Sequence, residues 1–158
     1  PLMHVIAAKA AAFKEALSNE FVNYSKQTLL NAKAICKSLK ENDFDIISGD
    51  TDCHMLLINL NNKNVTGKIA EKSLDNAGIT CNKNSVPFDE KSPFITSGIR
   101  IGTAAGTTRG FKEKEFIYIG SLISDVISSL NKDEATITKV SKIVREKVQA
   151  LCNQYPLY

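Results

Sequence analysis

Apolar residues recur at intervals of three and four over four stretches of the chain, and this spacing predicts amphipathic helices. The predicted helices cover residues 21–39, 67–76, 112–130 and a last stretch that begins after Asp133. Thr66 precedes the second of them, where its hydroxyl suits an N-cap, and Gly78 follows as a C-terminal stop. The pattern therefore indicates a chain in which helices bury one side only.

Shorter apolar runs bounded by turn residues predict four strands, over residues 44–47, 54–60, 79–81 and 97–103. The first two strands are joined by Ser48-Gly-Asp-Thr-Asp52, so they form an expected antiparallel pair. Residues 82–96 contain two prolines and no helical period, and we interpret them as an ordered loop. Helices and strands alternate in small groups, so the predicted fold is α+β, with helices on one face of a small, mainly antiparallel sheet.

The first helix, predicted over residues 2–17, differs from the others because it is apolar on most sides. Such a helix is normally buried on most sides. The rest of the chain offers little to cover it. We therefore expect the chain to be a fragment of a longer protein whose preceding part packs on this helix.

Composition narrows the classes of function. The 158 residues fit one domain with its own core, and 43% of them are apolar and 23% charged. The formal charge of +3 is too small to favour a nucleic-acid partner, and no apolar run is long enough to span a membrane. The four cysteines are widely spaced, which argues against a disulfide framework or a zinc site and favours reduced thiols in the cytoplasm.

Arg100 is the first candidate for chemistry. Its neighbours Ile99 and Ile101 point to the opposite face of the predicted strand, because side chains alternate along a strand. Gly98 and Gly102 share the face of Arg100 and leave space around its guanidinium, whose planar fork matches a carboxylate. The alternative is a structural arginine on the wet face of an antiparallel sheet, with glycines that only relieve packing.

The loop from Cys81 to Phe94 is the second candidate, because long ordered loops often carry function. Within it, Asn84 can both donate and accept hydrogen bonds, as recognition of an amide-like heterocycle edge requires. A simple surface excursion is the alternative. The glycine-containing pieces 66–68 and 102–110 do not match phosphate-binding motifs, and no catalytic dyad is brought together by the sequence.

Several segments of the chain resemble the serine hydroxymethyltransferase family. They are Pro1-Leu-Met-His-Val-Ile-Ala7, Asn82-Lys-Asn-Ser-Val-Pro87, Lys91-Ser-Pro-Phe-Ile-Thr-Ser-Gly-Ile-Arg-Ile-Gly-Thr103, Thr107-Thr-Arg-Gly-Phe111 and the ending with Cys152, Tyr155 and Pro156. They follow one another in the family's order and resemble its C-terminal part. Two positions depart from the family pattern, Ala104 in place of proline and Gly106 in place of a larger apolar residue.

The resemblance implies a pyridoxal-phosphate enzyme with the aspartate aminotransferase type of fold. Such an enzyme interconverts serine and glycine and transfers the one-carbon unit to and from tetrahydrofolate. Residues 1–28 would be the helical connection from a large domain, and residues 29–158 the small C-terminal domain. The intact enzyme would be a cytoplasmic homodimer or tetramer, without nucleic-acid or membrane partners.

The resemblance also implies the roles of individual residues. Arg100 would hold the α-carboxylate of serine or glycine and so orient the bond at the α-carbon that breaks. Asn84 would contact the folate, and Ser92, Pro93 and Phe94 would line the folate ring. The Schiff-base lysine and most cofactor contacts would lie upstream of Pro1, so we expect no catalytic residue, no metal site and no activity in this chain alone.

Two other functions stay open at this point. A free-standing regulatory domain could use Arg100 to sense an amino acid, and an interaction module could use the apolar first helix to dock on a partner. Calorimetry with glycine and with folate distinguishes them, because only the regulatory domain is expected to bind as an isolated chain.

Overall fold

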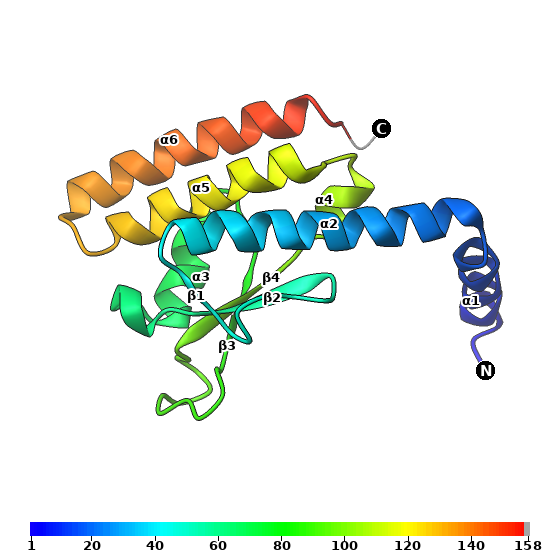
Figure 1. Ribbon diagram of the computed structural model, residues 1–158, viewed down its shortest axis with the longest axis horizontal. Helices are drawn as coiled ribbons and strands as arrows, with labels where there is room; N and C mark the ends of the chain where they lie inside the picture. The colour runs from blue at the N-terminus through cyan, green and yellow to red at the C-terminus, as the bar shows by residue number, and fades with distance from the viewer. Residues whose placement is uncertain (157–158) are drawn as a thin grey trace.

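The computed structural model describes residues 1–156 and has the predicted α+β architecture (Figure 1). The helices are α1 (Met3–Ala16), α2 (Asn19–Glu41), α3 (Gly67–Asn76), α4 (Ala104–Thr108), α5 (Glu113–Ser129) and α6 (Glu134–Asn153), with a 3-10 turn, η1, at Asn61–Lys63. The strands are β1 (Asp45–Ile46), β2 (Met55–Asn59), β3 (Asn82–Asn84) and β4 (Gly98–Gly102). Within residues 1–156, no helix has both the length and the apolarity needed to cross a bilayer.

The four strands form one antiparallel sheet in the order β1-β2-β4-β3. The predicted pairing of the first two strands is confirmed, with Ile46 opposite Ile58. Strand β4 is central and pairs with both β2 and β3, so that Arg100 faces Leu57 on one side and Asn82 on the other. This register fixes which side chains share a face of the sheet.

Helices cover one face of the sheet, and the core lies between them and the strands. Ile58 of β2 and Ile99 of β4 are fully buried there, against Ile35 of α2 and Ile123 of α5. Helices α2, α5 and α6 lie side by side above the sheet in Figure 1. Burial of these apolar surfaces is the main source of stability, at about 25 cal/mol for each Å².

Helix α1 is formed as predicted, but none of its residues is buried. It extends from the end of α2 that lies away from the sheet, and it turns away from the long axis of α2 (Figure 1). Phe13 is 67% exposed and Leu17, which follows the helix, is 88% exposed. The described part of the chain therefore leaves the apolar side chains of α1 uncovered.

The predicted strand over residues 79–81 is wrong, and the strand lies at 82–84 instead. The end of α3 explains the shift. Gly78 has a φ of +82°, its N–H bonds to the carbonyl of Asp75, and the N–H of Ile79 bonds to the carbonyl of Leu74 at 2.8 Å. This is the Schellman arrangement, which uses Ile79 in closing the helix. The predicted loop over 82–96 accordingly loses its first three residues to β3.

Helix α4 was not predicted, because Gly106 and two threonines are poor helix formers. Tertiary hydrogen bonds favour it instead. The buried amide of Asn31 in α2 donates to Thr107 Oγ1 at 2.9 Å and to the Phe111 carbonyl at 2.9 Å. Gly106 packs closely in this helix, since a Cβ there would lie 2.7 Å from the ring of Phe116.

Candidate functional site

The face of the sheet that the helices leave open carries the first candidate residue. Along β4, Ile99 and Ile101 are buried toward the helices, whereas Arg100 is exposed on the opposite face. The alternation predicted from the sequence is confirmed. Strands β2 and β3 contribute Leu57 and Asn82 beside Arg100 on the same face.

The guanidinium of Arg100 makes no hydrogen bond or salt bridge with any other residue in the range 1–156. It borders a hollow of about 680 Å³. Asn84 borders the same hollow, so the structure brings these two predicted residues together. A charged fork that is exposed, unpaired and next to a hollow of this size can receive a carboxylate.

The two glycines that flank Arg100 have different explanations. A Cβ on Gly98 would lie 2.6 Å from the carbonyl oxygen of Ile58 and 2.7 Å from Cγ1 of Val86. Gly98 is therefore required by close packing, which was the structural alternative for the glycines. A Cβ on Gly102 would meet nothing nearer than 3.8 Å, so only Gly102 leaves open space on the face of Arg100.

Other residues of the hollow were missed by the sequence analysis. Lys33 reaches it from α2, and Asp50, Thr51, Asp52 and Cys53 reach it from the connection between β1 and β2. The sequence identified that connection only as a turn. No local signal places it beside Arg100, because the placement follows from how β2 pairs with β4.

The charges around the hollow are mixed. Lys33 and Arg100 are cationic, and Asp50 and Asp52 are anionic. The N–H of Thr51 donates to Asp50 Oδ1 at 2.8 Å, and this hydrogen bond is the largest cause that lowers the pKa of the Asp50 carboxyl. Asp50 is therefore ionised at neutral pH. Because the hollow contains both signs of charge, a bound carboxylate would be attracted by the guanidinium of Arg100 and not by the net charge of the hollow.

Asn84 is half-buried at the end of β3. Its side-chain N–H donates to the carbonyl of Ser85 at 2.8 Å. The amide oxygen accepts no hydrogen bond from the described residues, 1–156, and so stays available to a ligand donor. This arrangement agrees with a group that reads a heterocycle edge.

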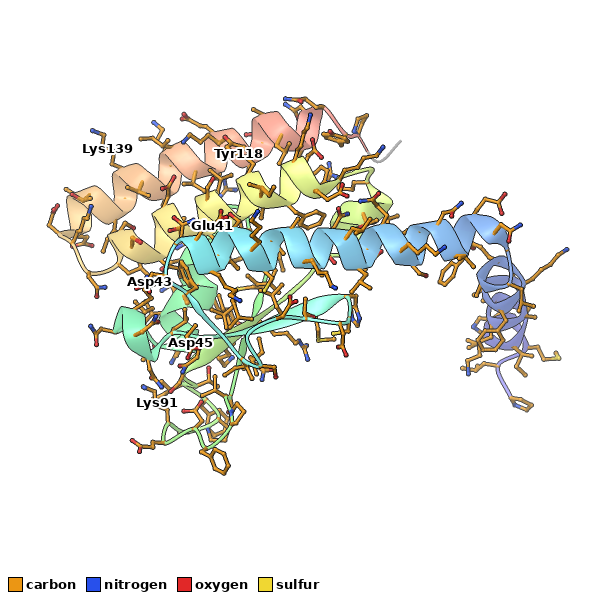
Figure 2. The ribbon with its side chains drawn as sticks, in the orientation of Figure 1. Glu41, Asp43, Asp45, Lys91, Tyr118 and Lys139 are labelled. Carbon is orange, nitrogen blue, oxygen red and sulfur yellow. The ribbon has the colours of Figure 1, made fainter. Side chains whose placement is uncertain are left out.

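The third predicted group, Ser92, Pro93 and Phe94, lies on the loop between β3 and β4 and does not border the hollow. The loop projects from the sheet, and Figure 2 shows Lys91 at its side. Phe94 is 80% exposed and Phe88, on the same loop, is fully exposed. The structure thus separates this aromatic turn from Arg100 and leaves its face free.

The projecting loop is ordered around Asp89, a residue that the sequence analysis did not single out. Partial burial raises the pKa of the Asp89 carboxyl, but hydrogen bonds from Ser97, Lys91 and Val86 lower it by more, and the resulting pKa lies well below the ordinary value. The carboxylate is therefore ionised throughout the neutral range. The only signal in the sequence was the position of an aspartate between the two prolines.

The residues around the hollow do not by themselves fit pyridoxal phosphate. The residues that border the hollow include no aromatic side chain that could stack on the pyridine ring of this cofactor. They do fit the carboxylate of a small amino acid.

Comparison with known proteins decides the family. The model of the family described as serine hydroxymethyltransferase matches residues 1–123. The chain belongs to the serine hydroxymethyltransferase family. It is 54% identical to the serine hydroxymethyltransferase of Bartonella henselae over 160 residues and 53% identical to that of Rickettsia akari over 160 residues. A third relative, from Novosphingobium aromaticivorans, is 54% identical over 159 residues.

Each alignment covers the whole of this chain but only 36–37% of the relative, in its C-terminal part. The predicted resemblance is therefore confirmed, and so is the fold class of a small C-terminal domain of this type of enzyme. Membership of the serine hydroxymethyltransferase family does not favour a free-standing regulatory domain.

Proposed function

We propose that this chain supplies the amino-acid and folate contacts of the small domain of a serine hydroxymethyltransferase. The complete enzyme would interconvert serine and glycine and exchange the one-carbon unit with tetrahydrofolate. The single observation that carries the proposal is the unpaired guanidinium of Arg100, which borders a hollow together with Asn84. The names of the relatives support the reaction.

Arg100 would donate two parallel N–H bonds to the two oxygens of the substrate α-carboxylate. Two bonds in one plane fix the rotation of the carboxylate, and with it the direction of the bonds at the α-carbon. The position of Arg100 is itself fixed, because Ile99 and Ile101 are anchored in the core on either side. Orientation of the substrate is thus the contribution of this strand.

Asn84 and the turn Ser92-Pro93-Phe94 would bind the folate. The free amide oxygen of Asn84 can accept an N–H of the heterocycle, and the exposed ring of Phe94 can pack on its flat face. Asn84 is the last residue of β3 and the turn lies on the loop that follows it, whereas Arg100 belongs to β4. The two substrates would therefore be contacted by adjoining but separable parts of the chain.

The cofactor, the catalytic lysine and the assembly are proposed for the complete enzyme. Pyridoxal phosphate would be held by the part of the relatives that this chain does not span, and so would the Schiff-base lysine. We expect residues 1–28 to connect to that part, residues 29–158 to form the small domain, and the enzyme to be a homodimer or tetramer. The four free cysteines agree with a cytoplasmic location.

The test is Arg100→Lys in the complete enzyme, with steady-state kinetics for both substrates. A single ammonium cannot reproduce the planar fork, and loss of a charge-assisted hydrogen bond costs about 1.5–3 kcal/mol. The KM for serine should therefore rise about 10- to 100-fold, while the KM for tetrahydrofolate stays close to its original value. An unchanged KM for serine would contradict the role of Arg100.

The isolated chain gives a second test. Calorimetry with glycine and with tetrahydrofolate should show almost no binding, because the chain presents only one side of the site. Tight binding of glycine by the isolated chain would instead favour an independent amino-acid sensor.

A further inference from the structure

The loop between β3 and β4 combines exposure with order. Its first part follows Asn84, its far turn carries Ser92 and Phe94, and its end leads into β4 and Arg100. Phe88 and Phe94 stand in solvent, so contacts of these rings with the core do not hold the loop in place. Polar interactions, both within the loop and with the rest of the domain, therefore contribute to its order.

One carboxylate receives four of these interactions. Asp89 Oδ2 accepts the N–H of Val86 at 3.2 Å and the N–H of Ser97 at 2.8 Å. Asp89 Oδ1 accepts the N–H of Lys91 at 3.0 Å and the hydroxyl of Ser97 at 2.7 Å. All four partners are donors, and only an ionised carboxylate offers acceptors alone.

The positions of the four donors show which parts of the loop Asp89 holds together. Val86 lies two residues after Asn84, so one bond fixes the segment just beyond the amide. Lys91 and Ser97 stand on either side of the turn 92–96, in which the carbonyl of Ser92 accepts the N–H groups of residues 95 and 96 at 2.8 and 2.9 Å. Asp89 therefore ties the beginning of the loop to both ends of the turn that carries Phe94.

The tied loop is also anchored to the rest of the domain. Lys91 Nζ donates to Ser97 Oγ and to Asn61 Oδ1, each at 3.0 Å. The N–H of Lys68, in the first turn of α3, donates to the carbonyl of Ile95 at 2.9 Å. The turn is thus held in a fixed place relative to α3 and to β4.

We propose that Asp89 is a positioning residue for folate binding: its carboxylate holds Asn84 and the Phe94 turn at a fixed separation, so that both reach one heterocycle. The carboxylate of Asp89 is already engaged by four donors, so its proposed role is to hold the loop and not to contact the folate. The inference rests on the proposed folate site. The hydrogen bonds of Asp89 would thus favour the binding of tetrahydrofolate and leave the binding of serine unaffected.

Asp89→Asn in the complete enzyme tests this role of the carboxylate, because an amide keeps the size of the side chain but replaces one acceptor oxygen by a donor. Asp133→Asn is the matched control. Asp133 also accepts backbone and hydroxyl bonds, from Thr136 N at 3.0 Å and Thr136 Oγ1 at 2.7 Å, but it caps α6 far along the chain from the loop. Asn84→Ala serves as the reference for a direct folate contact.

We expect Asp89→Asn to raise the KM for tetrahydrofolate about tenfold, equivalent to about 1.4 kcal/mol. The KM for serine should change less than about twofold, because Arg100 is fixed by the core. Ser97→Ala, which removes one of the four bonds, should give a smaller rise. Amide exchange at Val86 and Ser97 should become faster in Asp89→Asn but not in Asp133→Asn.

Four results would overturn the proposal. One is an unchanged KM for tetrahydrofolate in Asp89→Asn while Asn84→Ala raises it. Another is an equal rise for serine and tetrahydrofolate, or an equal effect of Asp133→Asn, since either would mark a general loss of stability. If Asn84→Ala leaves the KM for tetrahydrofolate unchanged, the folate site itself is wrong, and the role of Asp89 falls with it.

Discussion

Replacing each of the glycines that flank Arg100 by alanine should change stability in opposite directions. Both lie on the same strand and on the same face, so strand propensity alone predicts the same gain for each, about 0.5–1 kcal/mol. The structure separates them. At Gly98 a new Cβ would lie 2.6 Å from the Ile58 carbonyl oxygen and 3.0 Å from the Asn84 carbonyl oxygen, whereas at Gly102 the nearest atom is 3.8 Å away.

The size of the effect at Gly98 follows from what must move. Two of the three close atoms belong to the backbones of β2 and β3, which pair with β4 on its two sides, so rotation of the Val86 side chain alone does not relieve the overlap. Overpacking of this kind costs about 1–3 kcal/mol. After the gain in propensity is subtracted, we expect Gly98→Ala to destabilise by about 1 kcal/mol and Gly102→Ala to stabilise by up to about 1 kcal/mol.

Urea unfolding of the two variants, followed by circular dichroism, measures this difference. With a slope of about 1–3 kcal/mol per molar urea, the midpoints of the variants should differ by about 1–2 M. Equal midpoints, or a more stable Gly98→Ala protein, would refute the packing argument. They would restore the view that both glycines only clear space for a ligand.

Three further predictions concern ionisation, thiols and helix ends. The pKa of Asp89 lies below its unfolded value, so the contribution of Asp89 to stability is fully present above about pH 4 and is lost as the pH falls further. Amide protection at Ser97 should therefore be constant from about pH 5 to 8 and should decrease in acid. A decrease near neutral pH would contradict this. Burial raises the pKa of the Cys81 thiol to about 12, whereas Cys53 is exposed. An alkylating reagent at about pH 8 should therefore modify Cys53 first, as measured by mass spectrometry of peptides. Early labelling of Cys81 would count against the burial of this thiol in the core. Asp133→Ala removes the N-cap of α6 and should lower the free energy of unfolding by about 1 kcal/mol, with no change expected in either KM, and an unchanged stability would argue against the cap.

The elements with strong local signals were predictable from the sequence. Helix α3 spans the predicted residues, because Thr66 accepts the N–H of Ile69 and Gly78 adopts a left-handed conformation. The burial of Phe116 and Ile123 in α5 also follows from their spacing. In these elements the local chemistry and the tertiary structure agree.

Elements that depend on distant partners were not predictable. Helix α4 requires the buried amide of Asn31, which lies 76 positions away from Thr107. The strand predicted at 79–81 failed because the run Ile79-Thr-Cys81 has β propensity, while the C-cap of α3 uses Ile79. Propensity is a weak guide wherever a tertiary hydrogen bond or a cap competes for the same backbone.

The candidate site shows the same division. The direction of Arg100 and its place on the open face were predictable from alternation along β4. Its neighbours Lys33 and Asp50 were not, because they come from α2 and from the connection after β1. The need for Gly98 was equally hidden, since the carbonyl of Ile58 approaches it only in the paired sheet.

The most direct test of the central claim compares two ligands that differ only in the group that Arg100 is proposed to hold. In the complete enzyme, the dissociation constants of glycine and glycinamide are measured for the unchanged protein and for Arg100→Lys. The account predicts that the substitution weakens glycine binding about 10- to 100-fold and leaves glycinamide binding within about threefold, a coupling of about 1 kcal/mol or more between the guanidinium and the carboxylate. Equal weakening of both ligands would show that Arg100 does not bind the carboxylate.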